Sequence, residues 1–370
     1  MAMVAQLGRG GALALAALML ASPQRAAETL SAPTGPSIVQ QAATDLGARR
    51  VMAERITAAV ADFDGVVGVA VEEVATGWTF SIRGDEAMPQ QSVSKLWVSL
   101  AVLAAVDRGE LSLDERVTIR KDDLSLFHQP IRKFVGEAGY SASLRSLMDG
   151  AMRQSDNAAN DALVRRLGGP FAVQVAIVGR NIDGVRFGPG ERAMQTGAAG
   201  LEWRPEFSFE RHFWEAREAL PQDVRRAALE AYVRDPPDGA TPLGVCRGLA
   251  RLYRGELLSP DSTSLLLGLM SASWTGAGRL KSGLPPGWRL AHKTGTGQVM
   301  GSLNTGYNDV GLIIAPDGRV WAVAVMIAST REPLGRRQAL MGQVARAVAG
   351  APDPVVPPPA QSDEEAGVSG

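Results

Sequence analysis

The sequence predicts an α+β fold in which an antiparallel sheet, built from both ends of the chain, packs against a mostly helical subdomain. Two observations predict this class. Runs of apolar residues typical of strands, bounded by turn residues, occur near the start at 66–82 and again near the end at 288–327. Between them, residues 112–275 show mostly the apolar spacing of helices. A sheet contributed by both chain ends, with helices inserted between, is an α+β arrangement.

The predicted elements can be taken in chain order. Residues 44–63 form an amphipathic helix whose apolar face includes Ile56 and Phe63. An apolar helix opens at Ser92 and ends before Gly109. The predicted strands and the closing helix are 66–74, 78–82, 288–294, 310–314, 320–327 and 334–348.

Both chain termini read as segments outside the folded domain. Residues 1–27 resemble an export signal, with Arg9 before an apolar run at 10–21 and small residues after it. Because about 20 apolar residues are needed to cross a bilayer, no stable membrane span is expected, although a retained anchor is the alternative. The interpretation is a linker at 28–43, a domain at 44–350, a disordered Pro-rich acidic tail at 351–370, and a periplasmic or secreted protein.

Composition excludes several classes of function. The net charge of −1 and the mixed surface charges give no basic stripe, so nucleic acid is not an expected partner. Cys246 is the only cysteine, which rules out an intramolecular disulfide and gives no sign of a multi-cysteine metal site. Its apolar neighbours predict a core position. We expect a monomer with no metal and no organic cofactor.

Three short motifs, in order along the chain, carry the chemistry: Ser92-Val93-Ser94-Lys95, Ser155-Asp156-Asn157 and Lys293-Thr294-Gly295. A serine hydroxyl becomes a nucleophile when a neighbouring base takes its proton, and a lysine three residues further along a helix lies on the same face. Ser92 is the only serine followed by lysine at that spacing.

Lysine usage strengthens this interpretation. The chain has 33 Arg and only 5 Lys, and two of these five, Lys95 and Lys293, fall in the motifs. Arginine stays protonated in proteins, whereas a desolvated lysine can act as a base. The choice of lysine at these two positions therefore favours a chemical role over a general positive charge.

These motifs resemble those of the penicillin-recognising serine enzymes, and among them the class A β-lactamases. The resemblance covers residues 45–350 and includes stretches such as 155–160 and 283–288. It implies the β-lactamase/transpeptidase-like fold and a β-lactam or peptidoglycan-stem substrate. It also implies roles for individual residues. Ser92 would form the acyl-enzyme with Lys95 as its base, Ser155 would relay a proton, and the substrate would contact Asn157, Lys293, Thr294, Gly295 and the backbone N–H of Thr296.

The same resemblance points to Glu191 as the group that activates water for deacylation. Glu191 lies 36 positions after Ser155 and five after Arg186, as in the family. The family's water-holding Asn is replaced by Gln195, which is one methylene longer and should place the water less well. The alternative is that Glu191 is a surface carboxylate.

Two further departures concern the surroundings of the site. The Arg that closes the family's loop is replaced by Pro189, and its candidate partner Asp238 is displaced by a helical insert at 196–233. We therefore expect that no such salt bridge closes the loop and that the insert covers the lower rim of the site. The strand after Thr296 lacks an arginine for the substrate carboxylate, and the candidates to replace it are Arg336 or Arg337, with Arg331 a weaker one.

Other functions stay open from the sequence. A D-alanyl-D-alanine carboxypeptidase or penicillin-binding enzyme would share the three motifs, and a non-catalytic peptidoglycan-binding protein could share the fold. A Ser-His-Asp triad is disfavoured because no G-x-S-x-G motif accompanies the three histidines. His292 is expected to be packed or solvated, and Phe127 to line the cleft or plug it.

Overall fold

The computed structural model describes residues 38–352. Contacts divide the chain into two units, Met1–Asp45 and Leu46–Gly370. Helix α1 (Ile38–Ala61) begins in the first unit, and every other helix and strand described here belongs to the second. The predicted signal, most of the linker and nearly all of the tail lie outside the described residues. Within the described range, no helix combines the length and the hydrophobicity that crossing a bilayer requires.

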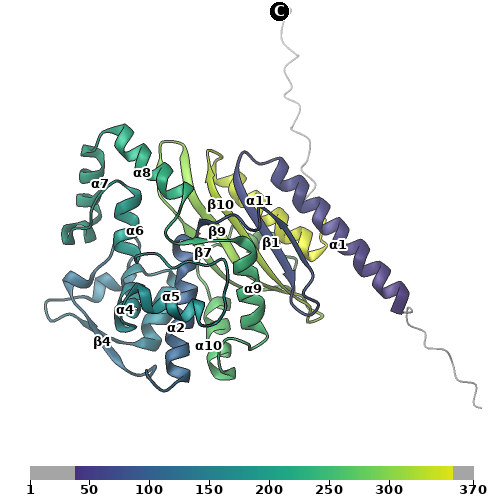
Figure 1. The fold of residues 1–370 in the computed structure, drawn as a ribbon, viewed down its shortest axis with the longest axis horizontal. Helices are drawn as coiled ribbons and strands as arrows, with labels where there is room; N and C mark the ends of the chain where they lie inside the picture. Colours follow the sequence, from purple (N-terminus) through teal and green to yellow (C-terminus); the bar gives the residue numbers. More distant parts are fainter. Residues whose placement is uncertain (1–37, 353–370) are drawn as a thin grey trace, which may run out of the picture. The chain divides into compact units, whose positions relative to one another are not determined.

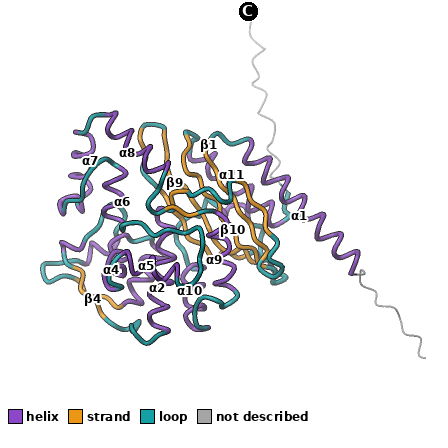
Figure 2. The backbone as a smooth tube through the Cα atoms, in the orientation of Figure 1, coloured by secondary structure: helices purple, strands orange, loops and turns teal. Residues whose placement is uncertain are grey.

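The strands from the two chain ends form one antiparallel sheet, as predicted (Figures 1 and 2). The strand order is β2-β1-β10-β9-β7, and β8 pairs with β9. The strands are β1 (Gly65–Glu73), β2 (Thr79–Ile82), β7 (Arg289–Thr296), β8 (Val299–Met300), β9 (Leu303–Ile314) and β10 (Val320–Thr330). β9 begins seven residues before its predicted start; its residues 307–314 pair with β7, and its first two residues pair with β8.

Side chains alternate between the two faces of this sheet, as a strand geometry requires. On β10, Val323, Val325 and Ile327 pack with α1 and α11 (Leu334–Ala349) on one face. Small residues between them, such as Ala322 and Ala324, face the opposite core. That core also contains residues of α9 (Pro242–Tyr253), which contacts β1 and β10. Small side chains on this face let the helix approach the sheet closely.

The helical part lies beside the sheet face that carries Ala322 and Ala324, and α2 runs through this part (Figure 1). Trp97 and Leu100 of α2 are fully buried, and Cys246 lies in the same core, as predicted. The helices of this part are α2 (Lys95–Asp107), α3 (Leu144–Asp149), α4 (Asn157–Arg166), α5 (Pro170–Val178), α6 (Glu191–Ala198), α7 (Glu210–Ala219), α8 (Gln222–Arg234) and α10 (Pro260–Ser271). Two short two-stranded antiparallel sheets, not predicted, pair β3 (Met88–Pro89) with β6 (Gly239–Ala240) and β4 (Arg116–Ile119) with β5 (Tyr140–Ser143).

The predicted insert is helical. Pro221 immediately precedes α8, where its fixed φ and missing N–H suit the start of a helix. Phe207 and Phe213 are buried, and Phe213 packs edge-on against Phe127 at 5.0 Å between ring centroids. Not every aromatic side chain of the insert is buried, since Trp214 and Phe209 remain more than one-third exposed. The insert is thus anchored by its own small apolar cluster next to the cleft.

Candidate active site

Ser92 lies in a single 3₁₀ turn, residues Gln91–Ser94, that leads directly into α2. The side chain of Lys95 is fully buried, and its Nζ donates to Ser92 Oγ at 2.8 Å. Gln91, immediately before the serine, has a φ of +53°, which turns the chain sharply. The first turn of a helix also leaves backbone N–H groups unpaired, and the Ser92 N–H belongs to this turn.

Ser155 and Lys293 form a second hydroxyl–amine pair. Lys293 Nζ donates to Ser155 Oγ at 2.9 Å and to the carbonyl oxygen of Thr294 at 2.9 Å. Ser155 has a φ of +62° between a π-helical turn and α4. Asp156 caps α4 by accepting from Ala159 N at 2.9 Å. Burial raises the pKa of the Asp156 carboxyl.

Electrostatics set Lys293 apart from an ordinary lysine. Its side chain is fully buried, and burial lowers its pKa well below the usual value, with further lowering by the positive charges of Lys95 and Arg279. Burial removes the water that would stabilise the ammonium ion, and like charges act in the same direction. Lys293 is therefore suited to giving up or sharing a proton with the Ser155 hydroxyl.

Strand β7 approaches the Ser92 turn so closely that one position must be glycine. A Cβ on Gly295 would lie 2.3 Å from the carbonyl oxygen of Gln90, which is far inside van der Waals contact. Asn308 on β9 holds the same turn by donating from Nδ2 to Pro89 O at 2.7 Å and to Gln90 O at 3.0 Å. The third motif thus brings Thr296, at the end of β7, beside the Ser92 turn.

Arg279 is the arginine that lines the cavity of the site, and none of the three predicted candidates lines it. Its Nη2 donates to Thr296 Oγ1 at 2.6 Å, and its Nη1 donates to Gly295 O at 2.8 Å. Each of the three predicted candidates has another contact. Arg331 donates to Ser302, Arg336 pairs with Asp62, and Arg337 lies over the Tyr307 ring, over which Arg279 also lies.

Glu191 is buried and close to the nucleophile, which a surface carboxylate would not be. Its Oε1 accepts from Lys95 Nζ, so one ammonium group contacts both Ser92 and Glu191. Gln195 Nε2 lies 3.4 Å from Glu191 Oε2. The Glu191 backbone N–H donates to Asp161 Oδ1 at 3.3 Å, and burial together with the charge of Glu191 raises the pKa of Asp161 to about 6.

The loop carrying Glu191 is closed by different contacts from those of the relatives. Asp238 forms no salt bridge with position 189, which is Pro189, but Arg186 Nη2 pairs with Asp235 Oδ1 at 2.7 Å. Arg186 N also donates to Gly239 O at 2.9 Å. Asp238 is buried instead of ion-paired at the surface, and its carboxylate accepts from Gln91 N and from Tyr232 OH. The sequence indicated Arg186 by its position five residues before Glu191, but it did not indicate Asp235 as its partner, because Asp235 lies after the insert.

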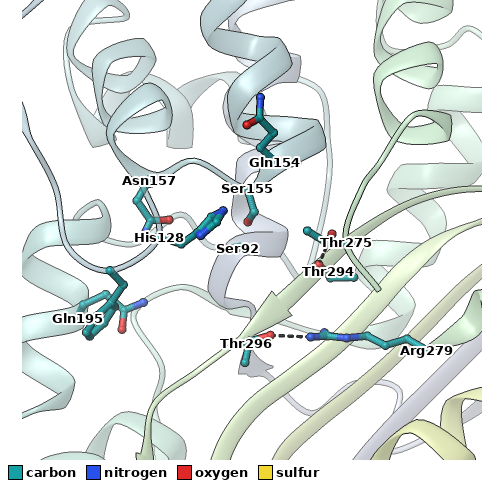
Figure 3. A pocket seen from close by; sticks show the side chains of 11 residues that line it. Ser92, His128, Gln154, Ser155, Asn157, Gln195, Thr275, Arg279, Thr294 and Thr296 are labelled. Carbon is teal, nitrogen blue, oxygen red and sulfur yellow. Dashed lines mark hydrogen bonds between the residues drawn. The ribbon is translucent and has the colours of Figure 1, made fainter. Parts of the chain in front are cut away.

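A cavity of about 260 Å³ brings most of these groups together between β7 and the helical part. Figure 3 shows its lining side chains converging on Ser92 from several elements. They are Ser92, Phe127, His128, Gln154, Ser155, Asn157, Gln195, Thr275, Arg279, Thr294 and Thr296. Asn157 is held there by donating from Nδ2 to Leu126 O at 2.8 Å.

A second cavity of about 330 Å³ continues from the first and shares Phe127, Gln195 and Thr296 with it. Trp214 of α7 forms one wall, and residues 297–299 form another. Arg217 Nη2 donates to Val299 O at 3.0 Å and ties the insert to this turn. The insert therefore borders the site, as expected.

The histidines do not form a triad with Ser92 in this geometry. His292 is buried and its Nδ1 pairs with Asp309 Oδ1 at 2.7 Å, which agrees with the prediction of a packed histidine. His128 lines the cavity, while the Ser92 hydroxyl accepts from Lys95. Across residues 38–352, no three His, Cys, Asp or Glu side chains gather in a way that could hold a metal ion.

An α+β fold with a serine activated by a lysine in a cleft beside the sheet defines a serine hydrolase of the penicillin-recognising type. A sequence profile described as "Beta-lactamase enzyme family" matches residues 51–351. The chain belongs to this family, and it is a serine β-lactamase of class A.

Curated relatives and solved structures agree with this assignment. The chain is 29% identical to the extended-spectrum β-lactamase PER-1 of Pseudomonas aeruginosa over 80% of this chain and 85% of that one. It is 25% identical to β-lactamase VEB-1 of the same organism over 76% and 83%. A crystal structure of a β-lactamase from Chitinophaga pinensis aligns with a TM-score of 0.65 at 28% identity, covering 82% of this chain and 98% of the other.

Proposed function

We propose that the protein is an exported enzyme that hydrolyses the β-lactam amide through an acyl-Ser92 intermediate, with water activated by Glu191 for deacylation. The observation that carries this proposal is the buried contact of one lysine, Lys95, with both Ser92 Oγ and the Glu191 carboxylate. Nucleophile, base and deacylating group are then a single hydrogen-bonded unit.

For acylation, a proton shared between Lys95 and Glu191 can rest on the carboxylate, which leaves a neutral amine to accept the Ser92 proton. Ser92 Oγ then bonds to the lactam carbonyl carbon, and the carbon–nitrogen bond breaks. The departing nitrogen takes a proton from the Ser155 hydroxyl, which Lys293 can resupply at 2.9 Å. The backbone N–H groups of Ser92 and Thr296 would hold the oxyanion.

Substrate binding would use the positive end of the cleft. Arg279 gives it positive charge, and the hydroxyls of Thr294 and Thr296 are hydrogen-bond donors for a substrate carboxylate. Lys293 would act from behind them, through its contact with Ser155 Oγ. Gly295 provides the close backbone approach, and Asn157 would hold the substrate's side-chain amide. The second cavity would receive the substituent on that amide.

Before deacylation, Glu191 would lose the proton it took from Lys95 and Lys293 would regain one, both by exchange with solvent. Glu191 would then take a proton from water while the water oxygen attacks the ester carbonyl. The bond between the carbonyl carbon and Ser92 Oγ breaks, and Lys95 returns a proton to Ser92 Oγ. Gln195 approaches Glu191 only at 3.4 Å, so we expect real but slow hydrolysis limited by this step. The rival carboxypeptidase or penicillin-binding function lacks a competent deacylating carboxylate. The buried position of Glu191 supports the lactamase instead.

Nitrocefin kinetics with purified protein test the proposal. We expect steady-state turnover, an acyl adduct that maps to Ser92, and no adduct in Ser92→Ala. Glu191→Ala should retain the acylation burst and accumulate the acyl-enzyme, while the exposed control Glu218→Ala should behave as wild type. A stoichiometric burst without turnover in the wild type would indicate a penicillin-binding enzyme, and no reaction a binding protein. Wild-type deacylation in Glu191→Ala would refute its role.

Export rests on the N-terminal pattern at residues 1–27. Expression of the full chain in a bacterial host, followed by cell fractionation and intact-mass analysis, tests it. We expect the protein in the periplasm or the medium with its first residues removed. A full-length chain retained in the membrane fraction would favour the anchor instead.

A further inference from the structure

The insert contributes one buried polar side chain, Tyr232 of α8, to the surroundings of the nucleophile. Its hydroxyl donates to Asp238 Oδ1 at 3.0 Å and accepts from Gln91 Nε2. The other oxygen of Asp238 accepts the backbone N–H of Gln91 at 2.7 Å. Gln91 directly precedes Ser92. Tyr232 of the insert therefore contacts the catalytic turn directly through the Gln91 side chain and indirectly through Asp238.

The same glutamine continues the chain of hydrogen bonds toward the deacylating carboxylate. Gln91 Oε1 accepts from Gln195 Nε2 at 2.8 Å, and that nitrogen lies 3.4 Å from Glu191 Oε2. Gln298 donates from Nε2 to Gln195 O at 2.7 Å and to Gln195 Oε1 at 3.1 Å. The side chains of Gln91, Gln195, Gln298 and Glu191 are all buried, and of these four only Gln195 borders the first cavity.

The two ends of this chain determine its direction. An ionised carboxylate only accepts hydrogen bonds, and the chain ends at Asp238 on one side and Glu191 on the other. The Tyr232 proton must therefore point to Asp238, which leaves its oxygen to accept from the amide of Gln91. Gln91 then presents its carbonyl to Gln195, and the Gln195 amino group has a second hydrogen available for Glu191.

We propose that Tyr232 is a positioning residue for deacylation, which through Gln91 orients the Gln195 amide toward Glu191. This inference rests on the proposed function of Glu191. Without the phenol oxygen, Gln91 Nε2 loses its acceptor, so its amide is no longer held in one orientation. Gln195 would then lose the fixed carbonyl that directs its amino group at Glu191.

Acylation should depend much less on Tyr232 than deacylation. The Lys95–Ser92 contact that activates the nucleophile does not pass through this chain of hydrogen bonds. The backbone of Gln91 also keeps its bond to Asp238 when the phenol is lost. A positioning role therefore predicts a separation of the two steps, whereas a general loss of stability would slow both.

The test is Tyr232→Phe, which removes one oxygen and keeps the ring. Stopped-flow nitrocefin kinetics at pH 8 should show a burst rate within about twofold of wild type and deacylation about tenfold slower or more, because small misplacements of a reacting group are costly. The matched control is Tyr253→Phe on α9, an exposed tyrosine, which should leave both rates unchanged. The melting temperature of each variant reports whether it is folded.

A double-mutant cycle with Gln195→Leu tests the route of the effect. If Tyr232 acts through Gln195, its replacement should have little further effect on deacylation in the Gln195→Leu background. Equal slowing of both steps, additive effects in the cycle, or unchanged deacylation in Tyr232→Phe would each overturn the inference. Glu191→Ala keeps the two proposals distinguishable. If Glu191→Ala traps the acyl-enzyme while Tyr232→Phe deacylates normally, only the positioning role of Tyr232 fails. If Glu191→Ala itself deacylates normally, both proposals fail.

Discussion

The surroundings of Lys293 show why an arginine could not take over its role. Lys293 is fully buried, contacts the Ser155 hydroxyl at 2.9 Å, and has a lowered pKa because of burial and neighbouring positive charges. Arginine would keep the charge, but it is larger and cannot share a proton with Ser155.

We therefore predict that Lys293→Arg lowers kcat/KM for β-lactams by about tenfold or more, roughly 1.4 kcal/mol of transition-state stabilisation. Steady-state kinetics with a penicillin and a cephalosporin would measure this. The control is Lys133→Arg, at an exposed lysine, which should be neutral. Wild-type kinetics in Lys293→Arg would show that only its charge matters.

Arg279 is the corresponding case for substrate binding. It is almost fully buried, is held over the Tyr307 ring at 3.8 Å, and donates to Thr296 Oγ1 beside the cavity. We predict that Arg279→Ala raises KM for substrates bearing a carboxylate, with kcat/KM falling about tenfold because a charge-assisted contact is lost.

Arg331→Ala provides the comparison for that measurement. Arg331 was a candidate from sequence, but it donates to Ser302 at the surface. We expect its replacement to leave KM within about twofold of wild type, in keeping with the small value of exposed polar contacts. A larger rise in KM for Arg331→Ala than for Arg279→Ala would favour Arg331, the candidate from the sequence, as the residue that binds the substrate carboxylate.

The sequence located the three motifs because each is a continuous run whose side chains act together. It could not single out Arg279 among 33 arginines, because only the packing of residues 276–279 against β7 brings that guanidinium to Thr296. Tyr232 escaped for the same reason, since its partners Gln91 and Asp238 lie in other segments of the chain. Local patterns predict local chemistry, and contacts between distant segments require the fold.

At the scale of elements, the strands from both chain ends were predicted because apolar alternation and turns mark them clearly. The pairs β4–β5 and β3–β6 were missed because β3 and β6 have only two residues each, and β4 and β5 lie within the part of the chain whose apolar spacing is mostly that of helices. The insert was predicted as helical and bordering the site. Its role in lining the second cavity depends on Trp214, which the cluster around Phe213 leaves partly exposed.

The insert should therefore affect which substrates are preferred. Trp214 forms a wall of the second cavity, and a flat apolar surface there can pack against a large substituent on the substrate's side-chain amide. We predict that Trp214→Ala lowers kcat/KM about tenfold for substrates with an aromatic side chain, and much less for those with a small one. This corresponds to the loss of one buried aromatic contact.

A panel of cephalosporins that differ only in this side chain would measure the ratio. Phe209→Ala is the matched control, since Phe209 belongs to the same insert, is exposed, and does not line the cavity. An equal loss for all members of the panel would mean that Trp214 supports the fold of the insert instead of the selection of substrate.

At the scale of the whole molecule, two of the buried carboxyl groups in the described residues have pKa values raised to about 6. Asp161 and Asp238 each reach a pKa of about 6, in both cases mainly through burial and in part through the negative charge of Glu191. Neither has an arginine or lysine as its hydrogen-bond partner in the described residues. Asp161 accepts from Ser125 Oγ and Glu191 N, and Asp238 from Tyr232 and Gln91.

The sign of the pH dependence follows from these shifts. An aspartate with a raised pKa binds its proton more tightly in the folded state than in the unfolded chain. Its contribution to the free energy of unfolding is therefore largest below a pH of about 4 and is lost as the pH rises through about 6. A shift of about two pKa units corresponds to about 3 kcal/mol for one group, as an order of magnitude.

We predict that Asp238→Asn is more destabilising at pH 4.5 than at pH 7.5, because the wild type gains stability from protonating Asp238 in this window and the variant cannot. Denaturant unfolding at several pH values measures the difference in the free energy of unfolding between wild type and variant. Asp114→Asn, at an exposed loop position, should show a difference that does not change with pH. If the difference for Asp238→Asn instead grows as the pH rises, the carboxylate form is the stabilised one, and the folded protein must hold Asp238 ionised through contacts stronger than its burial.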